Sequence, residues 1–226
     1  MILTLEQLEE IHACEPARDL FKEVFGEKAN LGEVVRELHK RNLYEYEAWL
    51  LAQDYELTKE LIKADVNIHA YGDDALHLAA GNGHLELVKF LIKSGLDIHT
   101  NGDYALHSAA RNGHLEVVKF LIKSGVDIHT NGDLALRLAA RTGHLEVVKF
   151  LIKAGADIHA YDDYALCFAA ENGHLEVVKL LLDKGANIHA NDNGIIRSAV
   201  YYNRFDVIKL FWEAIKKKKQ LIAARG

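Results

Sequence analysis

The sequence is poor in proline and cysteine, with one and two copies in 226 residues. Because proline is the residue that most often interrupts helices, its scarcity predicts a helix-rich chain. Cys14 and Cys167 lie far apart in the sequence, and neither has another thiol nearby. A disulfide framework and a zinc cluster of cysteines are therefore excluded, and both residues are interpreted as free thiols.

Long apolar runs are also missing, since no stretch reaches the 18 or so uninterrupted residues that a membrane-spanning helix needs. The first ten residues, MILTLEQLEE, carry acids where a secretory signal needs bases. Half of the residues are hydrophobic and 27% are charged, which suits a folded core rather than a disordered chain. We therefore expect a cytoplasmic protein, of a bacterium or of an infected host cell, with no membrane as partner.

The net charge of -6 is distributed unevenly along the chain. Residues 1–70 carry 8 basic and 15 acidic side chains, whereas residues 191–226 carry 8 basic and 3 acidic ones. The chain thus has an acidic head and a basic tail. Such a gradient can orient a charged partner or order contacts between copies.

A repeated segment decides the fold class. GNGHLELVKFLIKSG at Gly81 recurs as RNGHLEVVKFLIKSG at Arg111, RTGHLEVVKFLIKAG at Arg141 and ENGHLEVVKLLLDKG at Glu171. The period is 30 residues, and weaker copies start at Ala52 and Tyr201. A fixed period of this length is typical of proteins built by stacking small units.

The period predicts the domain organisation. The central units are 71–100, 101–130, 131–160 and 161–190, flanked by a degenerate capping unit at 41–70 and a C-terminal capping unit at 191–220. Residues 1–40 precede the array, and 221–226 form a tail. Because a terminal unit has no further neighbour, the outer face of 191–220 is expected to be polar.

Each unit predicts two short helices, illustrated by 105–112 and the segment that begins at Leu115. Gly113 between them suits the left-handed residue that ends a helix, and Asn203 takes this position in the last unit. The second helix has a broad apolar stripe made of Leu115, Val118, Phe120, Leu121 and Ile122. Its glutamate and lysine rows face solvent.

Residues 1–40 lack the repeat and predict a small cap of about three helices. Thr4 and Gln7 form a capping box. Pro16 suits the first turn of a helix that runs to Phe25. Asn30 is expected to cap a third helix, and the module should cover the apolar end of the stack.

The units resemble the ankyrin repeat, whose pattern G-x-T-P-L-H-x-A-A-x-x-G-H-L-E-V-V-K-x-L-L is matched across residues 71–190. The resemblance implies an all-α solenoid of stacked helix-turn-helix units with an N-terminal helical cap. It also implies a scaffold that binds another protein on its concave surface, without catalysis, cofactor or small-molecule substrate. Units this short look like the arrays of giant viruses, phages and some bacteria, so the partner is expected to be a host protein.

Two departures from the family pattern carry expectations. The family unit has about 33 residues, so the projecting finger should be shorter here, the groove shallower and the strand content close to zero. The tetrapeptide T-P-L-H is replaced by sequences that start at Asp74, Tyr104, Leu134 and Tyr164. The aspartates that precede them, Asp73, Asp103, Asp133 and Asp163, are predicted to cap the first helices.

Nine of the thirteen histidines occupy two repeat positions. The resemblance gives His84, His114, His144 and His174 a structural role, joining adjacent units through loop backbone. His69, His99, His129, His159 and His189 should form a ladder with steps of roughly 10 Å, the spacing of packed helices. Zinc ligands must all lie within about 2 Å of one ion, so no metal site is expected.

Catalytic motifs are not apparent, because no serine or cysteine stands in a recognisable pattern beside a base and an acid. Cys167 is interpreted as a packed thiol. The lysines 216–219, with Tyr201 and Tyr202, leave nucleic-acid binding open as an alternative, through phosphate contacts and base stacking. The other interpretation is that lysines favour the end of a helix. An enzyme with an unrecognised site is the further alternative.

Candidate contact residues come from comparing the units, because positions that vary between copies are free to meet a partner. Variation concentrates in the loop and first helix, and tyrosine and arginine are enriched at binding hot spots. The aspartates favour a basic edge on the partner, whereas Arg111 and Arg141 would suit an acidic group. The predicted surface is Tyr71, Asp73, Asp74, Asp103, Tyr104, Arg111, Asp133, Leu134, Arg141, Tyr161, Asp163, Tyr164 and Glu171.

Overall fold

The computed structural model describes residues 2–10, 13–41, 43–53, 55–63 and 74–223. These residues form fifteen helices and two strands of three residues each, which confirms the helix-rich chain. No helix in these ranges combines the length and the hydropathy that crossing a membrane requires. The chain divides into two compact units, Met1–Asn101 and Gly102–Gly226.

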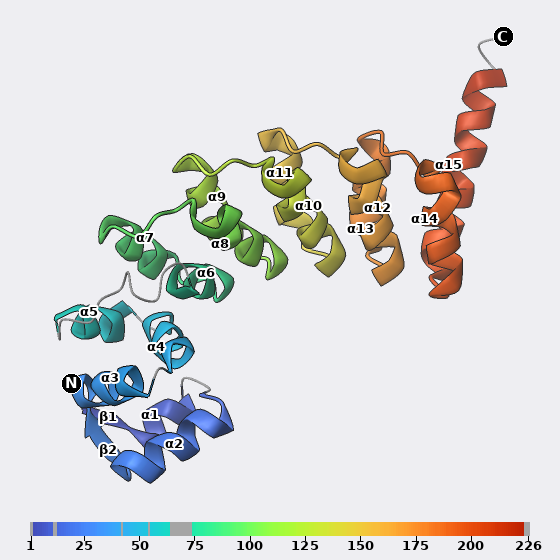
Figure 1. Ribbon diagram of the computed structural model, residues 1–226. Coiled ribbons are helices and arrows are strands. Elements are labelled where there is room, and N and C mark those ends of the chain that lie inside the picture. The colour runs from blue at the N-terminus through green and yellow to red at the C-terminus, as the bar shows by residue number, and fades with distance from the viewer. Residues whose placement is uncertain (1, 11–12, 42, 54, 64–73, 224–226) are drawn as a thin grey trace. The chain divides into compact units, whose positions relative to one another are not determined.

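The first unit begins with a small module and continues into helix pairs (Figure 1). Its elements are β1 (Ile2–Thr4), α1 (Leu5–Glu10), α2 (Glu15–Phe25), β2 (Lys28–Asn30), α3 (Leu31–Lys40), α4 (Tyr44–Leu51), α5 (Tyr55–Lys63), α6 (Asp74–Gly81) and α7 (Leu85–Lys93).

The helix boundaries of the N-terminal module follow the predicted signals. The Thr4 backbone N–H donates to Gln7 Oε1 at 3.0 Å, and the Gln7 N–H donates to Thr4 Oγ1 at 3.2 Å, which confirms the capping box. Pro16 lies in the first turn of α2, and Gly26 follows its last residue. The Gly32 N–H donates to Asn30 Oδ1 at 3.0 Å, so Asn30 caps α3 as expected.

The expectation of a purely helical cap is wrong in one respect, because β1 and β2 pair as an antiparallel ribbon. The ribbon joins the start of α1 to the start of α3, with Leu3 opposite Ala29. These two residues are buried while Ile2 and Lys28 are exposed. Alternation over three residues is too short a signal to read as a strand from sequence.

The second unit consists of helix pairs at the 30-residue period. Its elements are α8 (Thr100–Arg111), which starts just before the unit boundary, and α9 (Leu115–Lys123), α10 (Thr130–Thr142), α11 (Leu145–Ala154), α12 (Ala160–Asn172), α13 (Leu175–Asp183), α14 (Ala190–Tyr201) and α15 (Phe205–Ala223). The first helices pack side by side, α10 on α12 and α12 on α14. Their partners form a second row, α9 to α11 to α13 to α15 (Figure 1).

Small side chains allow the first helices to approach closely. Ala139 and Ala140 in α10, and their equivalents Ala169 and Ala170 in α12, are completely buried. In the second row Leu121 is completely buried as well, as the predicted stripe requires. Each helix pair therefore depends on the next for the burial of its apolar face.

A left-handed turn stands where longer family units carry a finger. Residues 131–133, 161–163 and 191–193 each place three consecutive residues at positive φ, between 50° and 64°. Asn, Asp and Gly tolerate this conformation best, and they fill eight of these nine positions. Tyr161 is the exception, at φ 54°. Within residues 74–223 no strand occurs, as the shortened unit predicts.

The last residue of the turns 131–133 and 161–163 is a buried acid that links neighbouring units. Asp133 Oδ1 accepts the backbone N–H of Asp157 at 2.9 Å, and Asp163 Oδ1 accepts that of Asn187 at 2.9 Å. Both carboxylates also face a histidine of their own turn, His129 at 3.1 Å and His159 at 3.0 Å. The prediction that these aspartates cap the first helices is wrong, because their bonds reach 24 residues ahead to the loop that leads into the next unit.

Candidate protein-binding surface

The predicted contact residues separate into three groups by their placement. Tyr71 and Asp73 lie outside the described residues. Asp74 is exposed at the start of α6, and its carboxylate lies 3.6 Å from His77 Nδ1. Most of the others lie on, or just before, the first helices of the repeats in the second compact unit, Gly102–Gly226.

Three of the predicted contact residues are not on the surface. Asp103, Asp133 and Asp163 are 4–5% exposed, and Asp103 accepts the Thr130 hydroxyl across units at 2.5 Å. Their carboxylates cannot touch a partner, so the expected preference for a basic edge loses its basis. The exposed charges near these turns include those of Arg111, Arg141 and Asp162.

The tyrosines do lie on the surface. Tyr104, Tyr161 and Tyr164 are 51%, 63% and 36% exposed. Arg111 and Arg141 are also exposed, and Leu134 is half-buried. Rings that stay exposed on packed helices lose little conformational freedom when they bind, since a tyrosine has only two side-chain torsions.

Tyr161 is held by Arg137, which lies outside the predicted contact set. The Arg137 guanidinium carbon lies 4.4 Å from the centroid of the Tyr161 ring. Arg137 also donates to two carbonyls of the preceding left-handed turn, that of Asn131 at 2.7 Å and that of Gly132 at 3.1 Å. A Cβ at Gly132 would collide with the Tyr161 ring, so glycine at this position leaves the space that the ring occupies. The residue at position 137 differs from its equivalents in the other central repeats, and this variation was the sequence signal that could have identified Arg137 as a contact residue.

Arg141 and Tyr164 meet through a third residue. The Arg141 guanidinium carbon lies 5.4 Å from the Phe168 ring centroid, and Phe168 packs edge-on against Tyr164 at 5.2 Å. Two arginines on α10 therefore contact rings of the next unit. Arg137 contacts Tyr161 in the turn, and Arg141 contacts Phe168, which packs against Tyr164 on the first helix. We name this set, Arg137, Arg141, Tyr161, Tyr164 and Phe168, the arginine–aromatic surface.

Glu171 has a structural role instead of a contact role. It is half-buried, accepts the Ser198 hydroxyl at 3.0 Å and faces the Cys167 thiol at 3.5 Å. Burial, and then the negative charge of Glu171, raises the pKa of Cys167 to about 11. Because the thiolate is the reactive form, this cysteine is protonated and unreactive at neutral pH, in agreement with its interpretation as a packed thiol.

The repeated histidines join units as the resemblance implies. His174 Nε2 lies 2.9 Å from the Arg141 carbonyl of the preceding unit, a distance at which the ring N–H donates. In the last unit Arg204 replaces this histidine and donates to the Glu171 carbonyl at 2.7 Å. In the described part of the chain, no three His, Cys, Asp or Glu side chains converge as metal ligands do.

His107 differs from the other histidines because it is buried in the interior of the second unit. It is 3% exposed, and neither ring nitrogen finds a hydrogen-bond partner among the described residues. Burial lowers its pKa, outweighing the opposing influences of Asp103 and the Thr130 backbone. The native state therefore holds a neutral ring, whereas the unfolded chain binds a proton near the ordinary pKa of about 6.5.

This difference predicts a pH effect. Below about pH 6.5 the unfolded state binds more protons than the native state, so stability falls as pH falls, by up to about 1.4 kcal/mol per pH unit for one group. His107→Leu removes the titration and fills the same space with apolar atoms. Urea unfolding at pH 7 and pH 5 should show that wild type loses more stability than His107→Leu. Parallel losses in the two proteins would contradict this origin.

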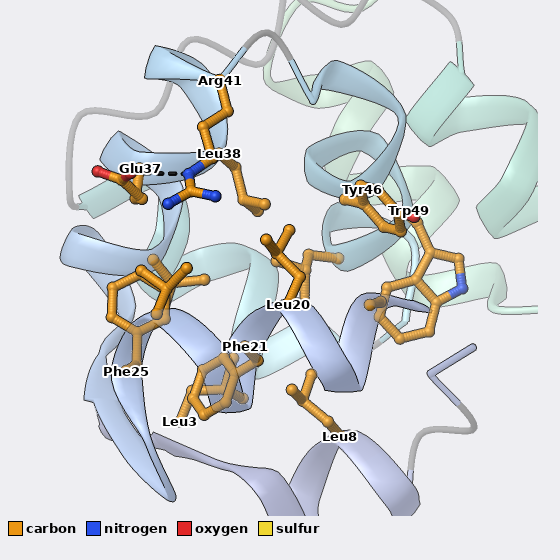
Figure 2. A pocket seen from close by; sticks show the side chains of 14 residues that line it. Leu3, Leu8, Leu20, Phe21, Phe25, Glu37, Leu38, Arg41, Tyr46 and Trp49 are labelled. Atoms are coloured by element: carbon orange, nitrogen blue, oxygen red, sulfur yellow. Dashed lines mark hydrogen bonds and ion pairs between the residues drawn. The ribbon is translucent and has the colours of Figure 1, made fainter. Parts of the chain in front are cut away.

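The first unit contains an apolar hollow that the sequence did not reveal (Figure 2). Its volume is about 40 Å³, and Leu20, Phe21, Leu38 and Trp49 are among the side chains around it. An ion pair from Arg41 Nε to Glu37 Oε1 at 2.8 Å lies at its edge and lowers the pKa of Glu37. The space is smaller than the roughly 300 Å³ at which ligand pockets begin, so it belongs to the packing of the module.

Sequence comparison agrees with the repeat architecture. The family model described as Ankyrin repeats (3 copies) matches four overlapping segments, residues 28–101, 46–132, 94–162 and 136–220. In a search of curated proteins no sequence matched. The matched segments cover most of the chain, and their helix pairs repeat with the period and inter-unit contacts described above. The chain belongs to the ankyrin repeat family.

Proposed function

We propose that the chain is a protein-binding scaffold that holds a partner protein on the arginine–aromatic surface. Ankyrin repeats generally mediate protein–protein interaction and are typically not enzymes. The observation that carries the proposal is the contact of Arg137 with Tyr161 at 4.4 Å, next to the chain of Arg141, Phe168 and Tyr164. Exposed rings fixed by neighbouring cations form a rigid, partly apolar patch of the kind that anchors interfaces.

The charge of this surface favours an acidic partner group. Arg137 and Arg141 project from adjacent turns of one helix. Asp133 and Asp163 are buried in bonds between units, which leaves Asp162 as the exposed acid of the neighbouring turn. The family implies a concave location for the first helices, and this stays a prediction. The similarity of the 30-residue unit to viral, phage and bacterial arrays extends the proposal to a host protein met in a cytoplasm.

The test uses two double variants of the whole chain. Affinity capture from host cytosol should enrich a partner with wild type, and the Arg137→Ala/Tyr161→Ala variant should lose it. Truncating anchors of this kind costs about 2 kcal/mol or more, which corresponds to at least a 30-fold weaker Kd. Lys119→Ala/Lys149→Ala is the matched control, because these lysines sit on second helices in exposed pairs with glutamates at 2.7 Å.

Two results would count against the proposal. One is a partner that still binds Arg137→Ala/Tyr161→Ala but is lost from the lysine control. The other is an arginine–aromatic variant that keeps the affinity of wild type. If the variant instead loses its helical circular dichroism, its loss of binding reflects unfolding. In that case Tyr164→Ala alone, which removes only the outer ring, gives the deciding measurement.

A further inference from the structure

The last helix pair exposes aromatic side chains where a terminal unit was expected to be polar. Tyr201, Phe205 and Trp212 are 79%, 73% and 73% exposed. Val200 is 54% exposed, whereas Ala170, its equivalent one unit earlier, is completely buried. The prediction of a polar terminal face is therefore wrong. This side has the composition of a contact between units, and large exposed apolar patches usually mark interaction sites.

Helix α15 is built to receive another helix. It has 19 residues, against 9 in α13, and it carries a seven-residue repeat. The segment FDVIK, from Phe205 to Lys209, recurs as WEAIK, from Trp212 to Lys216. An aromatic residue, an acid, an isoleucine and a lysine therefore each recur after seven residues. Helices that pack against each other along their length show this sequence period.

The two copies of this pattern make a seam with a charged edge. Phe205, Ile208, Trp212 and Ile215 alternate at spacings of three and four residues, with the aromatic rings exposed and the isoleucines half-buried. A hollow of about 450 Å³ runs beside Trp212, Ile215, Lys216, Lys219 and Gln220. The side chains of a second helix would fill this space.

We propose that this seam binds a second copy of the chain, with the two α15 helices antiparallel in a closed dimer. Two-fold symmetry makes every contact occur twice, so the surface must complement itself. The two acids of α15 and two of its exposed lysines do so in one register. Glu213 faces Lys209 of the second copy, and Asp206 faces Lys216 of the second copy, and both pairs are centred on position 211.

The same register aligns the apolar residues. Trp212 lies level with the turn that contains Ile208 of the second copy, and Phe205 lies level with the turn that contains Ile215. Apolar burial then provides the driving force, while the ion pairs select the register. A nucleic acid or an anionic lipid surface would be attracted by the lysines, but neither requires an acid and an isoleucine at a seven-residue repeat.

The experiment measures molecular mass in solution by sedimentation and light scattering. Wild type should change from 25.3 kDa at low concentration to twice that mass as concentration rises. Glu213→Lys alone and Lys209→Glu alone should each be monomeric, because each places like charges opposite one another twice. An equimolar mixture of the two should regain the dimer, since every pair in the mixed species has opposite charges.

Trp212→Ala should also be monomeric while keeping the helical circular dichroism of wild type. The paired changes Glu116→Lys and Lys119→Glu on α9 are the control and should leave the dimer intact. A wild-type chain that stays at 25.3 kDa up to millimolar concentration overturns the proposal. So does a mixture that remains monomeric. A monomer whose tryptophan fluorescence responds to oligo-uridylate or to phosphatidylserine vesicles, with the response lost in Trp212→Ala, also overturns it. The arginine–aromatic surface is not involved, so the two proposals fail independently.

Discussion

Replacing Asp163 by alanine should lower the free energy of unfolding by about 1.5–3 kcal/mol, the range for removing a hydrogen bond to a charged group. The buried carboxylate accepts the Asn187 N–H at 2.9 Å and faces His159 at 3.0 Å. Without it, the backbone donor of the following loop is left unpaired. Chemical denaturation followed by circular dichroism measures the loss.

Asp162→Ala is the matched control for this change. Asp162 occupies the same left-handed turn, with φ 62° against 59° for Asp163, but its side chain is exposed. Both substitutions therefore place alanine in the same strained backbone region. The difference between the two variants isolates the buried bonds, and equal losses would show that the carboxylate does not hold the units together.

Leu121→Ala should cost about 2–5 kcal/mol, the usual range for emptying a packed core position. The Leu121 side chain is completely buried in α9, a helix that packs against the next second helix, α11. Lys123→Ala, two residues later on the exposed side, should change stability by no more than about 0.5 kcal/mol. A loss below about 1 kcal/mol for Leu121→Ala would mean that the stripe on the second helices is not the core.

Features governed by short-range chemistry could be predicted from the sequence. The capping box at Thr4, the proline in the first turn of α2 and the helix-ending glycines depend on residues at most a few positions apart. The apolar stripe of the second helices follows from their periodicity. These signals were enough to establish the repeat, the helix pairs and the fold class.

Features imposed by tertiary contacts could not be predicted in this way. Tyr161 adopts a positive φ because its turn is fixed by the bonds of Asp163 to the next loop and by packing on Gly132. Aspartate before a helix ordinarily indicates a cap, and only the position of the following unit shows that the carboxylate points there instead. Burial at these sites depends on groups 24 residues away.

The arginine–aromatic surface was predicted in part. Variation between units selected Tyr161, Tyr164 and Arg141, which the structure brings close to Arg137 and Phe168. The prediction also included Asp103, Asp133 and Asp163, which recur unchanged at this repeat position, because a place in the loop before the first helix does not reveal where an acid points. The exposure of Trp212 could not be predicted either, since an apolar residue at a repeat position is normally covered by a neighbour.

Each buried aspartate accepts a hydrogen bond from the loop that leads into the following unit, and this affects how such an array can change length during evolution. Acceptor and donor recur with the 30-residue period, so a duplicated unit would arrive with both halves of its connection already present. Insertion of a copy between existing units would leave every junction chemically complete. In the last pair this position is Asn193, an exposed amide whose Oδ1 lies 2.6 Å from His189 Nδ1. A copy inserted before this pair would keep every aspartate junction intact.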